Sequence, residues 1–202
     1  MTDGLSVVVS KYESANTKVI IPDGVTHIGV GAFLNCTHIK TVNLPEGIIS
    51  IGEEAFSGCT ALEELLLPST LKHIGPRAFR SCRGLKKIHI PRGVDVIPDQ
   101  AFSLCTFLEE VTGGEGLYGI GEEAFANCQS MKRCEPLEHA VDLGTHAFSW
   151  CNELAQPPFN RHFVYIGDEC FRHCISFHNT EVSLDAEYIG SNIFTGCTAL
   201  PQ

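Results

Sequence analysis

A period of 23 residues runs through the sequence and constrains its fold more than any other feature. The motif I-G-x-x-A-F-x-x-C recurs with this step, and the Cys three residues after each Phe keeps it too, which accounts for eight of the ten cysteines. A fixed step of this length is typical of a solenoid, in which every repeat forms one coil. The repeated Phe residues are Phe33, Phe56, Phe79, Phe102, Phe125, Phe148, Phe171 and Phe194.

Each repeat carries its own pattern of secondary structure. We number its positions from the leading apolar residue, which is Ile28 in repeat one and Ile74 in repeat three. Positions 15 and 17 are apolar around a polar residue, as in Ile88-His89-Ile90, and this alternation indicates a strand. Position 2 is Gly in seven of eight repeats, and acidic residues are common at positions 3 and 4. Glycine suits a tight turn and acids suit the first turn of a helix, so we expect a strand, a turn and a short helix per repeat.

Composition excludes several classes of function. Hydrophobic residues make up 44% and charged residues 19%, as in a globular protein. The net charge of −10 argues against nucleic acid or an anionic membrane as a partner. No apolar run approaches the roughly 20 residues that cross a bilayer, so we expect no membrane insertion. The start, MTDGLSVVVSKYES, does not resemble a secretory signal, which predicts a cytoplasmic location with reduced thiols.

The segment Leu62–Phe79, LEELLLPSTLKHIGPRAF, followed by Cys82, resembles the BspA-type leucine-rich repeat. That family repeats the pattern L-x-x-L-x-L-P-x-x-L-x-x-I-G-x-x-A-F-x-x-C, and the resemblance covers about Val19 to Leu200. It implies an α/β repeat solenoid, a right-handed coil with a parallel concave sheet and short helices on the convex side. It also implies a binding role, because some relatives on bacterial and protozoan surfaces adhere to host matrix proteins.

The expected organisation is an N-terminal cap over residues 1–18 and a solenoid over residues 19–202, with about seven and a half repeats. No nucleophile–base pair, phosphate loop or paired-carboxylate motif stands out, and the family brings no catalytic residue and no cofactor. We therefore expect a non-catalytic module that binds a protein of unknown identity, and the resemblance extends this to an adhesin-like role. The alternative is a spacer, or a repeat fragment of a larger surface protein, with no binding site of its own. The resemblance also allows a location at the cell surface.

The candidate contact residues on the predicted concave strands are Glu64, Lys87, His89, Glu110 and Arg133. Charges at positions 13 and 14 alternate in sign from one repeat to the next. In a parallel sheet these residues are lateral neighbours, so they either pair and set the register or form a binding surface of mixed sign. The alternating residues are Lys40, Glu63, Lys86, Glu109 and Lys132 at position 13, and Glu64, Lys87, Glu110 and Arg133 at position 14.

The second half of the sequence departs from its own pattern. Gly113-Gly114, Pro136 and Pro157-Pro158 are expected to interrupt the strands there. Trp150 and His162, together with Phe107, stand at positions that carry small or polar residues elsewhere. We expect repeats four to seven to hold the contact surface, with decay of the repeat as the alternative.

The cysteine column is expected to consist of buried free thiols. Neighbouring coils about 4.8 Å apart would bring successive Cys within disulfide range, but all of them point into the core. Cys134 and Cys170 lie off the column and are also expected in the core. Two combinations carry metal-binding chemistry, and exposed loop residues or core thiols are the simpler interpretation, so we expect no metal site. These combinations are His139, His162 and Asp185, and Cys170, His173 and Cys174.

Overall fold

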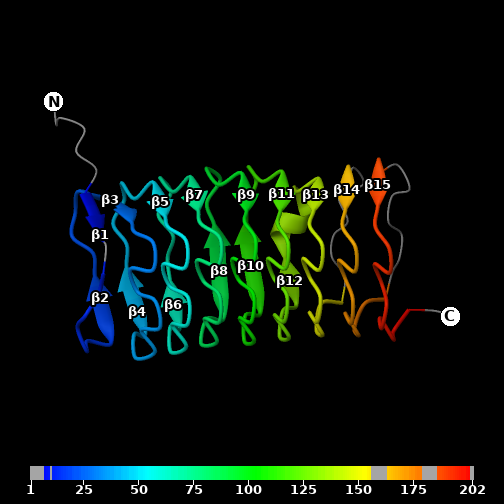
Figure 1. Ribbon diagram of the computed structural model, residues 1–202, viewed down its shortest axis with the longest axis horizontal. Helices are drawn as coiled ribbons and strands as arrows, with labels where there is room; N and C mark the ends of the chain where they lie inside the picture. The colour runs from blue at the N-terminus through cyan, green and yellow to red at the C-terminus, as the bar shows by residue number, and fades with distance from the viewer. Residues whose placement is uncertain (1–6, 10, 156–162, 179–185, 201–202) are drawn as a thin grey trace.

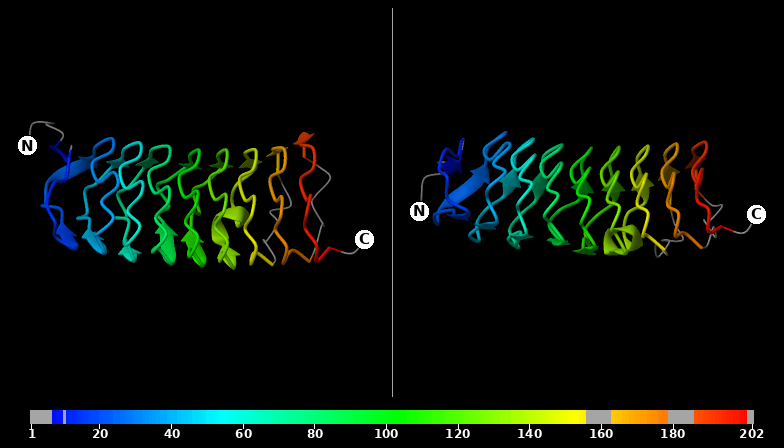
Figure 2. Two further views of the ribbon diagram at one scale, coloured as in Figure 1. Left: turned by 60° about the horizontal axis from the view of Figure 1, so that its bottom comes forward. Right: turned by 90° about the horizontal axis from the view of Figure 1, so that it is seen from below.

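The chain forms an elongated stack of coils, with its two ends at opposite ends of the stack (Figure 1). The structure, a computed structural model, describes residues 7–9, 11–155, 163–178 and 186–200. Seen from two further sides, the coils keep the same orientation along the whole stack (Figure 2). The 23-residue period therefore corresponds to one coil, as predicted.

Two columns of parallel strands run along the stack. Residues 23 apart are partners in both, as in the pairs Val42 with Leu65 and Ile51 with Ile74. Column A contains β1 (Val7–Val9), β3 (Val25–Ile28), β5 (Ser50–Ile51), β7 (His73–Ile74), β9 (Val96–Ile97), β11 (Gly119–Ile120), β13 (Asp142–Leu143), β14 (Tyr165–Ile166) and β15 (Tyr188–Ile189). Column B contains β2 (Lys18–Ile20), β4 (Thr41–Asn43), β6 (Glu64–Leu65), β8 (Lys87–Ile90), β10 (Glu110–Gly113) and β12 (Arg133–Cys134).

The prediction of short helices on the convex side is wrong. In the described residues the only helix is η1 (Glu135–Glu138), a 3-10 helix. Positions 4 and 8 of all eight repeats have positive φ, as at Arg77 (58°) and Ser81 (60°), and such residues break an α-helix. Ser81 N–H donates to Ser103 O of the next coil at 2.8 Å. This N–H is therefore not available for a hydrogen bond within a helix. Successive tight turns linked from coil to coil replace the helix.

The Phe residues of the motif form a stacked column in the core. Ring centroids of successive coils lie 4.9 Å apart for Phe33 and Phe56 and 5.1 Å apart for Phe79 and Phe102. Tyr12 continues the column at one end, 5.1 Å from Phe33. From Phe33 to Phe171 this column buries an apolar ring in each coil, which is how a repeat that cannot bury its own face is stabilised by its neighbours.

The cysteines occupy the core as free thiols, as predicted. All ten are free; nine are buried and Cys36 is half-buried. Cys134, in β12, and Cys170 are fully buried, as expected for the two that lie off the column. Each column Cys from Cys59 onward donates its thiol hydrogen to the carbonyl of the Phe 26 residues earlier, as Cys59 does to Phe33 at 3.1 Å.

Both strand columns are interrupted once, column B between repeats two and three and column A between the starts of repeats three and four, and we call this interruption the seam. No strand pairing joins β6 to β8 or β7 to β9, although the strands remain neighbours. At the junctions on either side of the seam position 13 donates to the same position one coil earlier, as Glu63 N–H does to Lys40 O at 2.9 Å and Glu109 N–H to Lys86 O at 2.8 Å. Among the described backbone hydrogen bonds none joins Lys86 N–H to Glu63 O. The turn side stays continuous, since Phe56 N–H donates to Ala78 O at 2.8 Å.

Pro98 accounts for the interruption of column A. Gly at position 2 normally donates to the preceding coil, as Gly75 N–H does to Ile51 O and Gly121 N–H to Ile97 O, both at 2.8 Å. Proline occupies this position only in repeat four, and it has no N–H to donate. The missing bond lies directly after β9, where column A is interrupted.

Two expected interruptions of column B have different outcomes. Gly113 does not break its strand, because it is part of β10 and pairs with Ile90 of β8. Its φ is +77°, and a Cβ there would lie 2.4 Å from Ile90 O, so glycine permits the close approach. Pro136 does lie where the strand ends, because it is part of η1, which follows β12 directly. Pro157-Pro158 lie outside the described residues.

Candidate protein-binding face

The outward side chains of column B form one continuous surface, which we call the B face. Ile88 and Ile90 of β8 are buried, so the alternating residues at positions 14 and 16 point outward, with position 13 beside them. The B face comprises Lys40, Glu63, Glu64, Leu66, Lys86, Lys87, His89, Glu109, Glu110, Thr112, Lys132 and Arg133.

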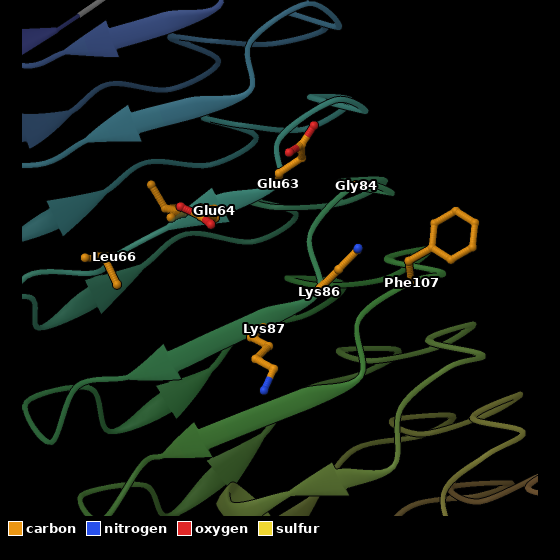
Figure 3. Close-up of a pocket in the computed structure, with 8 residues that line it drawn as sticks. Glu63, Glu64, Leu66, Gly84, Lys86, Lys87 and Phe107 are labelled. Carbon is orange, nitrogen blue, oxygen red and sulfur yellow. The ribbon is translucent and has the colours of Figure 1, made fainter.

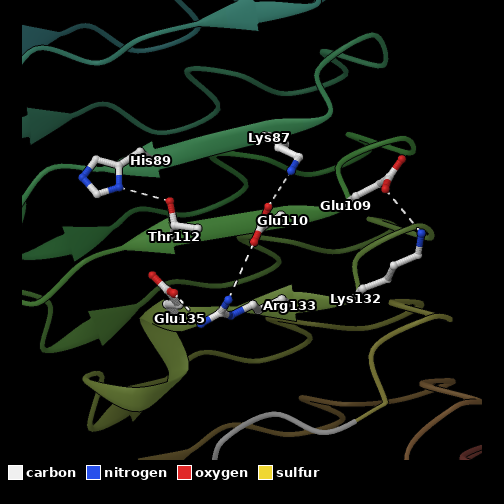
Figure 4. Close-up of polar contacts among 8 residues, drawn as sticks. All are labelled: Lys87, His89, Glu109, Glu110, Thr112, Lys132, Arg133 and Glu135. Atoms are coloured by element: carbon white, nitrogen blue, oxygen red, sulfur yellow. Dashed lines mark hydrogen bonds and ion pairs between the residues drawn. The ribbon is translucent and has the colours of Figure 1, made fainter.

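A ladder of ion pairs crosses the B face from β8 to β12 (Figure 4). Lys87 Nζ lies 2.8 Å from one carboxylate oxygen of Glu110, and Arg133 lies 3.8 Å from the other. The hydrogen bond and charge of Lys87 hold the pKa of Glu110 below its usual value. At position 13, Lys132 pairs with Glu109 at 3.3 Å. The predicted alternation of charge therefore places opposite charges side by side on these strands.

Four of the predicted contact residues lie together on this part of the face. Lys87, Glu110 and Arg133 belong to the ladder, and His89 Nδ1 lies 3.1 Å from Thr112 Oγ1 (Figure 4). Glu64 lies on β6, on the other side of the seam. The side chains are mostly exposed, so their mutual pairing contributes about 0–1 kcal/mol each and leaves them available to a partner.

A hollow of about 690 Å³ lies over the seam (Figure 3). It carries two exposed apolar side chains: Leu66 is 82% exposed and Phe107 is 60% exposed. Gly84 adds no side chain at one edge. The hollow is lined by Glu63, Glu64, Leu65, Leu66, Gly84, Lys86, Lys87 and Phe107.

The ion-pair ladder does not cross the seam. Glu63 pairs with Lys40 at 3.3 Å on one side, and Lys87 pairs with Glu110 on the other. Within the described residues neither Glu64 nor Lys86 makes an ion pair. The hollow thus has a negative wall from repeat two and a positive wall from repeat three, with apolar surface beside both.

Trp150 does not join the B face. It lies at position 8, on the turn side, where its ring stacks on His173 with 4.0 Å between ring centroids. Its side chain is 42% exposed. His162 lies outside the described residues. Trp150 and the strand residues of the B face therefore lie on different sides of the coil.

The hollow itself was not predicted. Its signals were in the sequence: Leu66 is the apolar residue at a position occupied by Asn43, His89 and Thr112 in neighbouring repeats. Pro98 marked the interrupted junction. Neither signal reveals on its own that the strands separate there, because that depends on backbone hydrogen bonds between coils.

The described residues contain no group of three or more side chains that could hold a metal ion. Burial raises the pKa of the Cys170 and Cys174 thiols, and His173 contacts Trp150. His162 and Asp185, of the other combination considered, are outside the described ranges.

No helix in the described part of the chain is both long and apolar enough to cross a membrane.

The sequence matches the family described as "BspA type Leucine rich repeat region". Six copies of the family's repeat match residues 11–132 and 119–202. No curated protein sequence matches the chain.

Solved leucine-rich repeat structures have a similar fold. A leucine-rich repeat protein of T. pallidum is 26% identical over 73% of this chain and 82% of its own, with a TM-score of 0.57. A leucine-rich cell surface protein of Faecalibacterium prausnitzii is 21% identical over 99% and 80% of the two chains, with a TM-score of 0.62. A leucine-rich repeat protein of Eubacterium ventriosum is 20% identical over 94% and 46%, with a TM-score of 0.67.

Proposed function

Because the chain belongs to the BspA-type leucine-rich repeat family, we propose that it is a non-catalytic module that binds a protein through its B face. Leucine-rich repeats are a general protein-interaction fold, and stacked coils present an extended rigid surface. The observation that carries the proposal is the hollow over the seam, where Leu66 and Phe107 are exposed beside charged side chains.

The hollow has the chemistry of a protein contact. Stable interfaces place apolar anchors at the centre and polar side chains around them. Leu66 and Phe107 supply apolar anchors at opposite ends of the hollow, and the charged side chains of Glu64, Lys86 and Lys87 lie between them (Figure 3). Because charges alternate along the face, no field of single sign builds up, and a partner of mixed charge suits it better than a strongly charged one.

The proposed contact differs in part from the sequence-based expectation. We place the main contact over the seam, at repeats two and three with Phe107 of repeat four, and with His89, Glu110 and Arg133 as its continuation, so it overlaps repeats four to seven only at their start. Trp150 and His162 would belong to a separate contact. A location at the cell surface, with an adhesin-like role, is part of the proposal and is supported by the fold of the cell surface protein of Faecalibacterium prausnitzii. The alternative remains a spacer without a binding site.

An affinity experiment tests this proposal. The immobilised protein is exposed to an extract of the source cell or its surroundings, and the retained protein is identified by mass spectrometry and titrated. Leu66→Ser should weaken its binding at least about tenfold, since a buried apolar anchor contributes about 1–2 kcal/mol or more. Val30→Ser is the matched control, because Val30 is 70% exposed on the turn side. Equal loss in both variants, or no retained partner at all, would favour the spacer.

A further inference from the structure

We infer that a second copy of this chain docks on the B face across the seam, with the two coil stacks running in opposite directions. This inference rests on the proposed binding role of the B face and names its partner. Its starting point is that Glu64 and Lys86, charges of opposite sign on opposite sides of the seam, have no ion-pair partner among the described residues.

The order of charges on the B face is its own complement. Position 13 reads positive, negative, positive, negative and positive through repeats one to five, and position 14 carries the same sign in repeats two to five. Reversing this order about the seam exchanges repeat two with repeat three, and repeat one with repeat four. The charged pairs that this exchange brings together, Lys40 with Glu109, Glu63 with Lys86 and Glu64 with Lys87, all have opposite signs, and uncharged Thr41 exchanges with Glu110. The residues are Lys40, Glu63, Lys86, Glu109 and Lys132, then Glu64, Lys87, Glu110 and Arg133.

A two-fold axis parallel to the strands performs this reversal. Placed above the seam, it brings two B faces together, keeps the strand direction and reverses the order of coils. Glu63 of one copy then faces Lys86 of the other, and Glu64 faces Lys87. The rotation repeats both contacts on the other side of the axis. Farther out, Lys40 of each copy faces Glu109 of the other.

The other face-to-face arrangement is disfavoured by the same charges. An axis parallel to the stack would keep the order of coils and place repeat two over repeat two. Glu63 and Glu64 of one copy would then face the same carboxylates of the other, and Lys86 and Lys87 would face lysines. Like charges opposite one another select against this arrangement.

The exposed side chain of Leu66 lies where the inferred contact covers it. Leu66 is at position 16, so in the two-fold arrangement it faces His89 of the other copy, and the two Leu66 side chains flank the axis. Removing this 82% exposed side chain from water favours association, while the charges fix the orientation. Because Glu63 and Lys87 also keep partners within their own chain, the association should be weak and sensitive to salt.

Charge reversal with mixing provides the test. Sedimentation equilibrium at low salt is measured for the whole chain, for a Glu63→Lys, Glu64→Lys variant and for a Lys86→Glu, Lys87→Glu variant. Each variant alone places like charges across the seam, so its self-association should weaken at least about tenfold. An equimolar mixture places lysines of one variant opposite carboxylates of the other and should recover association. Added salt should weaken the association of the wild type.

Two controls keep the test interpretable. Arg80→Glu with Arg83→Glu makes the same change in net charge as Lys86→Glu with Lys87→Glu, but at exposed turn residues, and should associate like the wild type. If a double variant fails to fold, the single changes Glu64→Lys and Lys86→Glu replace it, because neither residue makes an ion pair within the described chain.

A wild type that stays monomeric at low salt and about 1 mM protein, variants that associate normally, or a mixture without recovery would each overturn the inference. A monomer that still binds another protein through Leu66 would overturn only this inference and leave the proposed function standing. Loss of both would remove the proposed function as well.

Discussion

The thiol of Cys82 donates a hydrogen bond to the backbone carbonyl of Phe56 in the preceding coil, with 3.1 Å between sulfur and oxygen. The same bond recurs from Cys59 to Cys197, so the cysteine column joins neighbouring coils as well as filling the core. Burial raises the pKa of Cys59 and of Cys105 to about 12. Both effects keep these thiols protonated and unreactive.

Thiol labelling should therefore be selective. Cys36 is the half-buried cysteine, and we expect it to react first with an alkylating reagent in the native protein. Cys105 should react only through unfolding, since its thiolate is rare until the pH approaches about 12. Mass spectrometry of labelled peptides measures both rates. Rapid labelling of Cys105, or fewer than ten thiols after denaturation without reductant, would contradict the buried free-thiol column.

Two phenylalanines five residues apart should differ strongly in their effect on stability. Phe102 is fully buried between Phe79 and Phe125, whereas Phe107 is 60% exposed. Phe102→Ala should lower the free energy of unfolding by about 3–5 kcal/mol because it opens a cavity. Phe107→Ala, the matched control, should change it by no more than about 0.5 kcal/mol. Denaturant unfolding measures both, and similar losses would argue against the Phe column.

The turns that replace the predicted helices can be tested with two glutamines. Gln100 has a φ of +56°, which is strained for a residue with a Cβ, so Gln100→Gly should stabilise the protein by up to about 1 kcal/mol. Gln129 is exposed and has no positive φ, so Gln129→Gly should cost about 0.5–1 kcal/mol. Opposite shifts in the unfolding midpoint are expected. Shifts of the same sign would contradict the left-handed turn.

Acid should remove part of the stability that comes from Glu110. Its pKa is lowered by Lys87 and Arg133, so its contribution is present above the usual value of 4.5 and is lost as the pH falls through and below it. Between about pH 6 and pH 3 the wild type should lose about 0.5 kcal/mol more stability than Glu110→Gln. Glu115→Gln is the control, since Glu115 is exposed and makes no ion pair within the described chain. Parallel pH profiles for wild type and Glu110→Gln would contradict this role.

Much of the fold follows from sequence periodicity alone. The burial of Phe79, Cys82 and Ile88 is fixed by their places in the repeat. The helix prediction failed because Ala78, Phe79 and Cys82 suit a helical face equally well, and acids before them suit a first helical turn. Coil-to-coil hydrogen bonds such as the one from Phe79 N–H to Ala101 O decide the outcome, and no local pattern reveals them.

The candidate site was predictable in part. Alternating charges correctly placed Lys87 beside Glu110, because strand register follows the repeat. The seam was not predicted, since Glu64 and Lys87 have the same spacing as every other neighbouring pair. At Gly113 an interruption was predicted and the strand continues, because glycine in a strand can allow a close approach as well as end the strand.

The seam is tested most directly by residue-resolved hydrogen exchange, measured by NMR on the native protein. Lys86 N–H has no acceptor in the preceding coil, while Glu63 N–H and Glu109 N–H donate to the coils before them at 2.9 and 2.8 Å. The Lys86 amide should exchange at least about a hundredfold faster than the other two, relative to unstructured peptides. Equal protection of all three amides would show a continuous ladder through repeats two and three and would contradict the seam on which the binding face depends.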